Sequence, residues 1–190
     1  MTEQYILKKF SETGALLDGH FLLRSGLHSP QYFQCALLLQ HMPIAEELCG
    51  ELARKFDAKQ VDTVIAPAMG GLVVGQEVAR ALKKRFIFAE KDDAGKLVLR
   101  RGFTIQKGER LLVAEDVVTK GGRVVETMEI VKQHGGIVTG VGALVDRSNG
   151  AVNFGAPFHS LISLQVVAYE AANCPLCREK KIPLMKPGSK

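Results

Sequence analysis

Residues 111–123 read Leu-Leu-Val-Ala-Glu-Asp-Val-Val-Thr-Lys-Gly-Gly-Arg, an apolar run followed by two adjacent acids and a pair of glycines. The apolar run is typical of a buried strand, and the glycines open a predicted helix at about 122–134. Charged side chains are rarely buried without a partner. Glu115 and Asp116 at the end of such a strand therefore indicate a binding site. A solvated acidic rim, with glycines serving only packing, explains this pattern less well.

The turn after the strand has the chemistry of a phosphate site. Gly121 and Gly122 let backbone amides face a bound group, and the following helix adds the positive end of its dipole. Thr119 offers a hydroxyl, while Lys120 and Arg123 offer positive charge. The spacing matches neither a Walker loop nor the GxGxxG dinucleotide fingerprint. A sugar phosphate fits best, with its phosphate on the amides and its ribose hydroxyls on the two acids.

Short apolar strands alternate with amphipathic helices around this stretch. Strands are predicted at about 61–67, 85–89, 110–114, 137–145 and 160–168, and helices at about 72–84 and 122–134. The alternation predicts an α/β fold, a parallel twisted sheet with helices on both faces. Ligands bind beyond the carboxyl ends of the strands in such sheets. Three of these ends carry unusual residues: 67–71, 115–123, and Asp146 with Arg147.

The first 42 residues follow a different pattern. A helix is predicted at 3–12, two short strands at 20–24 and 31–35, and a further helix opens at Pro43. We therefore expect a single domain with an N-terminal helix and hood at 1–42, an α/β core at 43–170 and a tail at 171–190.

The composition is that of a globular intracellular protein. The 190 residues are 46% hydrophobic and 24% charged, which argues against disorder. No apolar run has the length of a membrane span, and the polar, acidic start lacks a signal pattern, so a cytoplasmic location is expected. The net charge of +5 is scattered and there is no Trp. This mild basicity suits a small anionic substrate as well as nucleic acid. The lack of an alternation of aromatic and basic residues argues against nucleic acid, and no membrane partner is expected.

Four cysteines are too few for a disulfide scaffold at this length. Cys35, at the end of a strand-like run, and Cys49, in a helical pattern, are expected to be small buried hydrophobes. Cys174 and Cys177 form a CxxC, half of a zinc site, with no second CxxC or paired His nearby in the sequence. Inert thiols are favoured for this pair, with a disulfide or a metal shared with another chain or site as alternatives.

Residues 111–123 resemble the type I phosphoribosyltransferase motif for 5-phosphoribosyl 1-pyrophosphate (PRPP), an apolar strand, two acids and a Thr-and-Gly loop. Three further segments resemble the orotate phosphoribosyltransferases within that family. Residues 21–33, Phe-Leu-Leu-Arg-Ser-Gly-Leu-His-Ser-Pro-Gln-Tyr-Phe, resemble their N-terminal hood. Residues 66–71, Ala-Pro-Ala-Met-Gly-Gly, resemble their pyrophosphate loop, and residues 145–147, Val-Asp-Arg, the strand end whose Arg meets the orotate carboxylate. The match covers roughly residues 5–150.

The resemblance implies transfer of phosphoribosyl from PRPP to orotate, giving orotidine 5'-monophosphate and pyrophosphate, with Mg²⁺. It also implies a homodimer in which a mobile loop, here 89–103, closes over the partner's site. Catalytic roles fall on Lys91, Asp116 and Glu115. PRPP contacts fall on Glu115, Asp116, Val117, Val118, Thr119, Lys120, Gly121, Gly122, Arg123, Lys91, Gly70 and Gly71. Orotate contacts fall on Thr119, Arg147, Arg24 and Phe33.

The sequence departs from the family pattern at four places. Glu90 stands where many relatives carry Arg, and Gly70 where the pyrophosphate loop often has Lys. Lys120 and Arg123 stand where small hydroxyl residues are common. Two other functions therefore stay open: a phosphoribosyltransferase for another base, and a PRPP-binding regulator.

The histidines give no site by pattern alone. His134 ends a predicted helix, where a cation suits the dipole. His28 lies in the hood and could approach the substrate. Surface or cap positions are expected for His20, His41 and His159.

Overall fold

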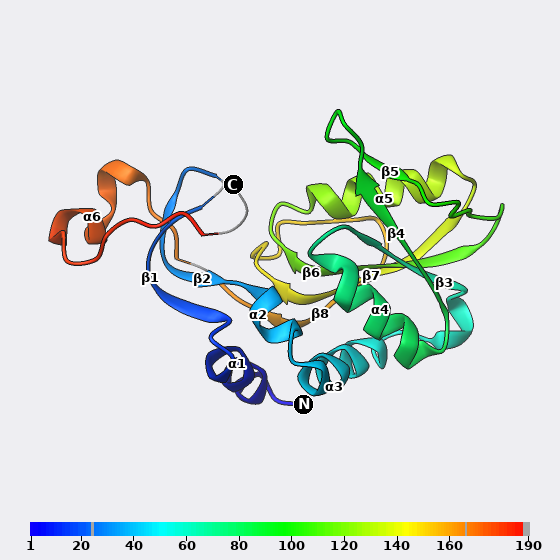
Figure 1. Ribbon diagram of the computed structural model, residues 1–190, viewed down its shortest axis with the longest axis horizontal. Coiled ribbons are helices and arrows are strands. Elements are labelled where there is room, and N and C mark those ends of the chain that lie inside the picture. The colour runs from blue at the N-terminus through cyan, green and yellow to red at the C-terminus, as the bar shows by residue number, and fades with distance from the viewer. Residues whose placement is uncertain (24, 166, 188–190) are drawn as a thin grey trace.

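The computed structural model describes residues 1–23, 25–165 and 167–187, and its centre is a six-stranded sheet (Figure 1). The strand order is β5-β4-β3-β6-β7-β8. All neighbouring strands are parallel except β5, which pairs antiparallel with β4. The strands are β3 Thr63–Pro67, β4 Arg85–Lys91, β5 Leu97–Leu99, β6 Arg110–Val118, β7 Ile137–Asp146 and β8 Phe158–Ser163.

Helices cover both faces of this sheet. The helices are α1 Glu3–Glu12, α2 Cys35–Leu39, α3 Met42–Ala53, α4 Gly71–Leu82, α5 Gly122–Gln133 and α6 Pro175–Glu179, with short 3-10 turns at Ala58–Gln60 and Ala171–Asn173. Side chains alternate along β6, so Leu112 packs in the cluster with α3 and α4, while Leu111 and Val113 pack in the cluster with α5. The prediction of a parallel sheet with helices on both faces is confirmed. None of the described helices has the length and apolar character needed to span a membrane.

The N-terminal residues form a hood beside the sheet. Helix α1 begins at Glu3, where the Thr2 hydroxyl caps it by accepting from the Tyr5 amide. Strands β1, Leu16–Leu22, and β2, His28–Phe33, then form an antiparallel hairpin with a break in register between Asp18 and Phe21.

The C-terminal tail pairs with this hairpin. Tyr169 bridges His28 in antiparallel fashion, and Met185 bridges Phe21 in parallel fashion. The Ser29 hydroxyl also donates to the Val167 carbonyl at 2.9 Å. Figure 1 shows α6 and the described residues that follow it on the hood, away from the helices that cover the sheet. The tail is therefore part of the hood's structure.

Several predicted boundaries are wrong. Strand β6 continues to Val118, because residues beyond Ala114 still pair with β7 as far as the Val118–Asp146 match. Cys35 begins α2 and does not end a strand. The hairpin strands begin and end earlier than expected, and β8 ends at Ser163, from where the chain crosses to the hood.

Candidate active site at the carboxyl end of the sheet

Glu115 and Asp116 lie at the carboxyl end of β6, in the middle of the sheet. The Asp116 amide donates to Glu115 Oε1 at 3.0 Å, and the Val117 amide donates to Asp116 Oδ1 at 2.7 Å. The Glu115 residue is only 6% exposed. Burial, and next the neighbouring Asp116 carboxylate, raises the pKa of Glu115 well above its ordinary value. Burial likewise raises the pKa of Asp116. A cation or a set of hydroxyl donors at this point would relieve both acids.

The turn between β3 and α4 lies directly on these acids. A Cβ atom on Gly70 would lie 2.9 Å from both Asp116 carboxylate oxygens, and one on Gly71 would lie 3.1 Å from Glu115 Oε1. Any side chain at either position would crowd the acids. The absence of a side chain also bares the backbone amides at the start of α4, where the helix dipole favours an anion. The end of β3 and the end of β6 therefore meet at one edge of the sheet.

The predicted phosphate loop joins β6 to α5. Gly121 has φ +74°, and a Cβ there would meet the Phe154 ring at 2.8 Å. A Cβ on Gly122 would meet no heavy atom of the described residues within 4 Å, so the space above the first turn of α5 is open. Thr119 and Lys120 are exposed. The Arg123 side chain donates to Glu126 Oε2 at 2.8 Å, which holds its guanidinium on the surface of α5.

Arg147 follows β7 and stands next to the end of β6, because its amide donates to the Val118 carbonyl at 2.8 Å. The guanidinium carbon lies 5.8 Å from the Phe33 ring centroid, which is a cation–π contact. Arg147 Nε is buried and has no hydrogen-bond partner among the described residues. Burial lowers the pKa of Arg147. An unpartnered buried guanidinium donor is a place for an anion, and a carboxylate matches its fork.

The pKa of the buried Cys35 thiol is influenced by both the β6 acids and Arg147. Burial raises the pKa of its thiol well above the ordinary value, and the Asp116 and Glu115 carboxylates raise it further while Arg147 opposes them. The thiol therefore lies within electrostatic range of both the β6 acids and the β7 guanidinium. Cys35 is buried, as expected.

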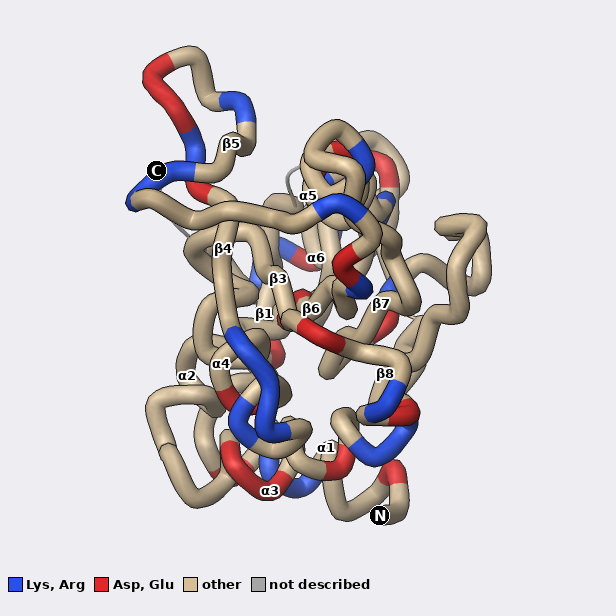
Figure 2. The backbone as a smooth tube through the Cα atoms, turned by 90° about the vertical axis from the view of Figure 1, so that its right-hand side faces the viewer, with Lys and Arg blue, Asp and Glu red and all other residues tan. Residues whose placement is uncertain are grey.

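Lys91 is not brought to the acids. It ends β4, pairs with Leu97 across the β4–β5 hairpin, and is exposed. Strand β3 lies between β4 and β6 in the sheet order, and Figures 1 and 2 show the hairpin projecting from the sheet. Arg101 pairs with Glu90 at 2.8 Å, so its charge is taken up within the hairpin. Arg24, predicted at the orotate site, lies outside the described residues.

Ser148 is a candidate site residue that the sequence pattern did not single out. Its Oγ is buried without a partner among the described residues, and its amide donates to Asp146 Oδ1 at 2.8 Å. The only sequence signal is its position directly after Arg147. Elsewhere, Figure 2 shows Lys and Arg interspersed with Asp and Glu along the chain, which agrees with the scattered charge of the sequence.

Comparisons with known proteins agree with this geometry. The family model for the phosphoribosyl transferase domain matches residues 38–172. An orotate phosphoribosyltransferase of Pelotomaculum thermopropionicum is 53% identical over 190 residues, covering 100% of this chain and 99% of the relative. One of Desulforamulus reducens is 51% identical, covering 100% and 98%. The crystal structure of orotate phosphoribosyltransferase from Aeropyrum pernix has a TM-score of 0.69 at 27% identity, covering 84% of this chain and 94% of that one. Because the matched region contains the whole sheet together with the acids of β6, the chain belongs to the phosphoribosyl transferase domain family.

Proposed function

We propose that this protein transfers the phosphoribosyl group from PRPP to orotate, releasing orotidine 5'-monophosphate and pyrophosphate. The observation that carries this proposal is the half-buried Arg147 side chain, whose guanidinium lies over the Phe33 ring and whose buried Nε is unpartnered among the described residues. A flat base that carries a carboxylate can pack against the Phe33 ring and pair with the Arg147 guanidinium, whereas adenine has no anionic group for that guanidinium. Relatives named for orotate, about half identical over the full chain, support the same substrate.

The site offers each part of PRPP a suitable surface. The 5-phosphate fits Gly121, Gly122 and the start of α5, and the ribose hydroxyls fit Glu115 and Asp116. The pyrophosphate fits the bare turn at 70–71 and the start of α4. The bond from the anomeric carbon to pyrophosphate breaks as the bond to orotate N1 forms. The positive charge that develops on the ribose then lies near the two buried acids.

Mg²⁺ suits this arrangement. Glu115 and Asp116 are oxygen donors whose pKa values are raised by burial, so a cation bound beside them with the ribose hydroxyls would favour their charged forms. When bound, the ion would neutralise charge on the departing pyrophosphate.

The projecting hairpin supports a homodimer as the working unit. Residues 89–103 extend from the sheet edge and carry the exposed Lys91, which continues β4 into the β4–β5 hairpin and away from the sheet. In the proposed dimer the hairpin closes over the partner's site, where Lys91 meets the pyrophosphate and water is excluded.

A spectrophotometric assay tests the proposal. The purified protein with PRPP and Mg²⁺ should consume orotate, followed by its absorbance, and should leave adenine and uracil unchanged. Turnover of adenine in place of orotate would assign a different base. Binding of PRPP by calorimetry without turnover of any base would favour a PRPP-binding regulator.

A further inference from the structure

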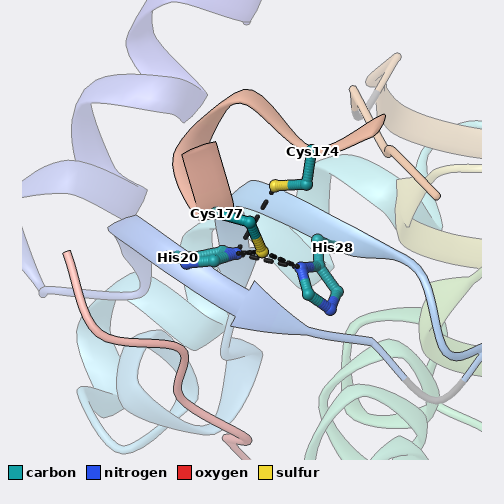
Figure 3. Close-up of side chains that lie close together, drawn as sticks. All are labelled: His20, His28, Cys174 and Cys177. Carbon is teal, nitrogen blue, oxygen red and sulfur yellow. Dashed lines mark hydrogen bonds between the residues drawn. The ribbon is translucent and has the colours of Figure 1, made fainter. Parts of the chain in front are cut away.

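Four metal-ligating side chains meet in the hood, far from the acids in sequence (Figure 3). His20 comes from β1, His28 from β2, and Cys174 and Cys177 flank and enter α6. Their ligand atoms all lie within 4.8 Å of one another. His20, expected at the surface or as a cap, is 2% exposed, so that prediction is wrong. The CxxC thus lies beside two histidines in the fold, although they are about 150 positions away from it in the sequence.

Four of the six separations between the ligand atoms are close to those of a tetrahedron around a small ion. His20 Nε2 lies 3.0 Å from His28 Nδ1, 3.5 Å from Cys174 Sγ and 3.6 Å from Cys177 Sγ. Cys177 Sγ lies 3.2 Å from His28 Nδ1. Tetrahedral zinc bonds imply edges of roughly 3.3 Å between nitrogens and roughly 3.6 Å between nitrogen and sulfur. These four separations therefore lie within a few tenths of an ångström of those edges.

Hydrogen bonding alone does not account for the cluster. His20 Nδ1 lies 3.2 Å from the Ile182 carbonyl, which can only accept, so Nδ1 carries the ring hydrogen and Nε2 keeps a single lone pair. Three groups face that lone pair, and only one of them can donate to it. A cation accepts a lone pair from all four ligand atoms at once. The Nδ1 contact with a backbone carbonyl is also the usual outer support of a metal-binding histidine.

We propose that His20, His28, Cys174 and Cys177 bind one zinc ion in a closed structural site. Two thiolates and two imidazoles in tetrahedral array select zinc, and four protein ligands leave no position for a substrate. Binding displaces the two thiol protons, and the two thiolates balance the charge of the ion. The site is separate from the magnesium expected with PRPP.

The ion would fasten the tail to the hood. Cys174 and His20 are 154 positions apart. Backbone hydrogen bonds already join the tail to the hairpin at two places. Tyr169 and His28 exchange amide–carbonyl bonds of 2.8 Å, and the Met185 amide donates to the His20 carbonyl at 2.8 Å. A cross-link across so long a loop removes much freedom from the unfolded chain. Because β2 ends at Phe33, the ion would also fix the ring beneath Arg147.

Metal analysis of purified protein tests the site. Full-length protein expressed in zinc-supplemented medium should contain about one zinc per chain by mass spectrometry of the metal. Cys177→Ser and His28→Asn should lose it. Cys49→Ala, a buried cysteine outside the cluster, and His41→Asn, an exposed histidine, should keep it. Zinc retained in Cys177→Ser and His28→Asn would overturn the proposal.

A second measurement covers variants that fail to fold. Wild-type protein stripped with a chelator should melt about 5–10 °C lower and recover with zinc. Co²⁺ added to the stripped protein should give sulfur-to-cobalt charge-transfer bands and the intense visible bands of tetrahedral cobalt. Metal-free wild-type protein with no cobalt bands would overturn the proposal. So would two titratable thiols in denaturant instead of the four that the sequence provides, since that result means a disulfide.

Discussion

At the scale of single residues, the candidate site consists of charged or titratable side chains that lack a partner of opposite charge among the described residues. Arg147 has a buried donor without a partner among the described residues, and Glu115 and Asp116 lie side by side with raised pKa values. A cationic side chain that lacks an anion and two acids that lack a cation or hydroxyl donors thus lie at the ends of the neighbouring strands β6 and β7. In the proposed function, orotate would supply a carboxylate to Arg147 and PRPP would supply ribose hydroxyls to the two acids.

Replacing Arg147 tests whether its guanidinium binds the carboxylate of orotate. Arg147→Ala should lower kcat/KM for orotate by about 100-fold or more, because a charged carboxylate loses its partner in a buried place. Steady-state kinetics would measure this, with Arg54→Ala as the matched control, since Arg54 pairs with Glu51 on an exposed helix surface. An unchanged kcat/KM in the Arg147 variant would remove orotate from the assignment.

The acids predict a pH dependence of stability. The folded pKa of Glu115 lies above its ordinary value of 4.5, so the folded state binds more protons than the unfolded state above that pH. Its contribution to stability is full below pH 4.5 and is lost as pH rises through the raised folded pKa. Glu115→Gln should therefore flatten the fall in the free energy of unfolding with rising pH. Urea titrations of both proteins at several pH values would show it, and parallel curves would contradict it.

At the scale of elements, glycines set how closely the β3–α4 turn approaches β6. Gly70→Ala should raise the KM for PRPP at least about tenfold, because its Cβ would stand 2.9 Å from both Asp116 oxygens and push the turn or the acid aside. Gly50→Ala in α3 is the control, since a Cβ there meets no heavy atom of the described chain within 4 Å and Ala favours a helix. Equal KM values for PRPP in the two variants would contradict the close approach.

The β4–β5 hairpin predicts complementation between subunits. Lys91→Ala and Asp116→Asn homodimers should each be nearly inactive. Mixed and allowed to exchange, they should regain up to about a quarter of wild-type activity, because half the dimers then carry one intact site. Activity that stays at the level of the separate variants would place Lys91 outside the partner's site.

At the scale of the whole molecule, the sequence predicts what is local and continuous. The sheet and its helices follow from apolar runs and 3.6-residue periodicity, and the β6 acids stand out because they break such a run. The extension of β6 to Val118 did not follow, since its pairing with β7 supports polar residues that propensity disfavours. The role of His20 did not follow either, because it depends on a tail 154 positions away and on a break in register at residues 18–21.

The pairing of the tail with the hood bears on how the chain is made. The hairpin is synthesised first, but Tyr169, Cys174 and Met185, which complete it, leave the ribosome after the whole sheet. The core can therefore assemble while the hood still lacks its partners. A nascent chain would carry the acids and the phosphate turn before it has the ordered Phe33 that backs Arg147. If Phe33 backs the bound base as proposed, the ability to bind the base would arise last. A chain interrupted after about residue 168 would keep the core fold while its hood lacks the segment that pairs with it.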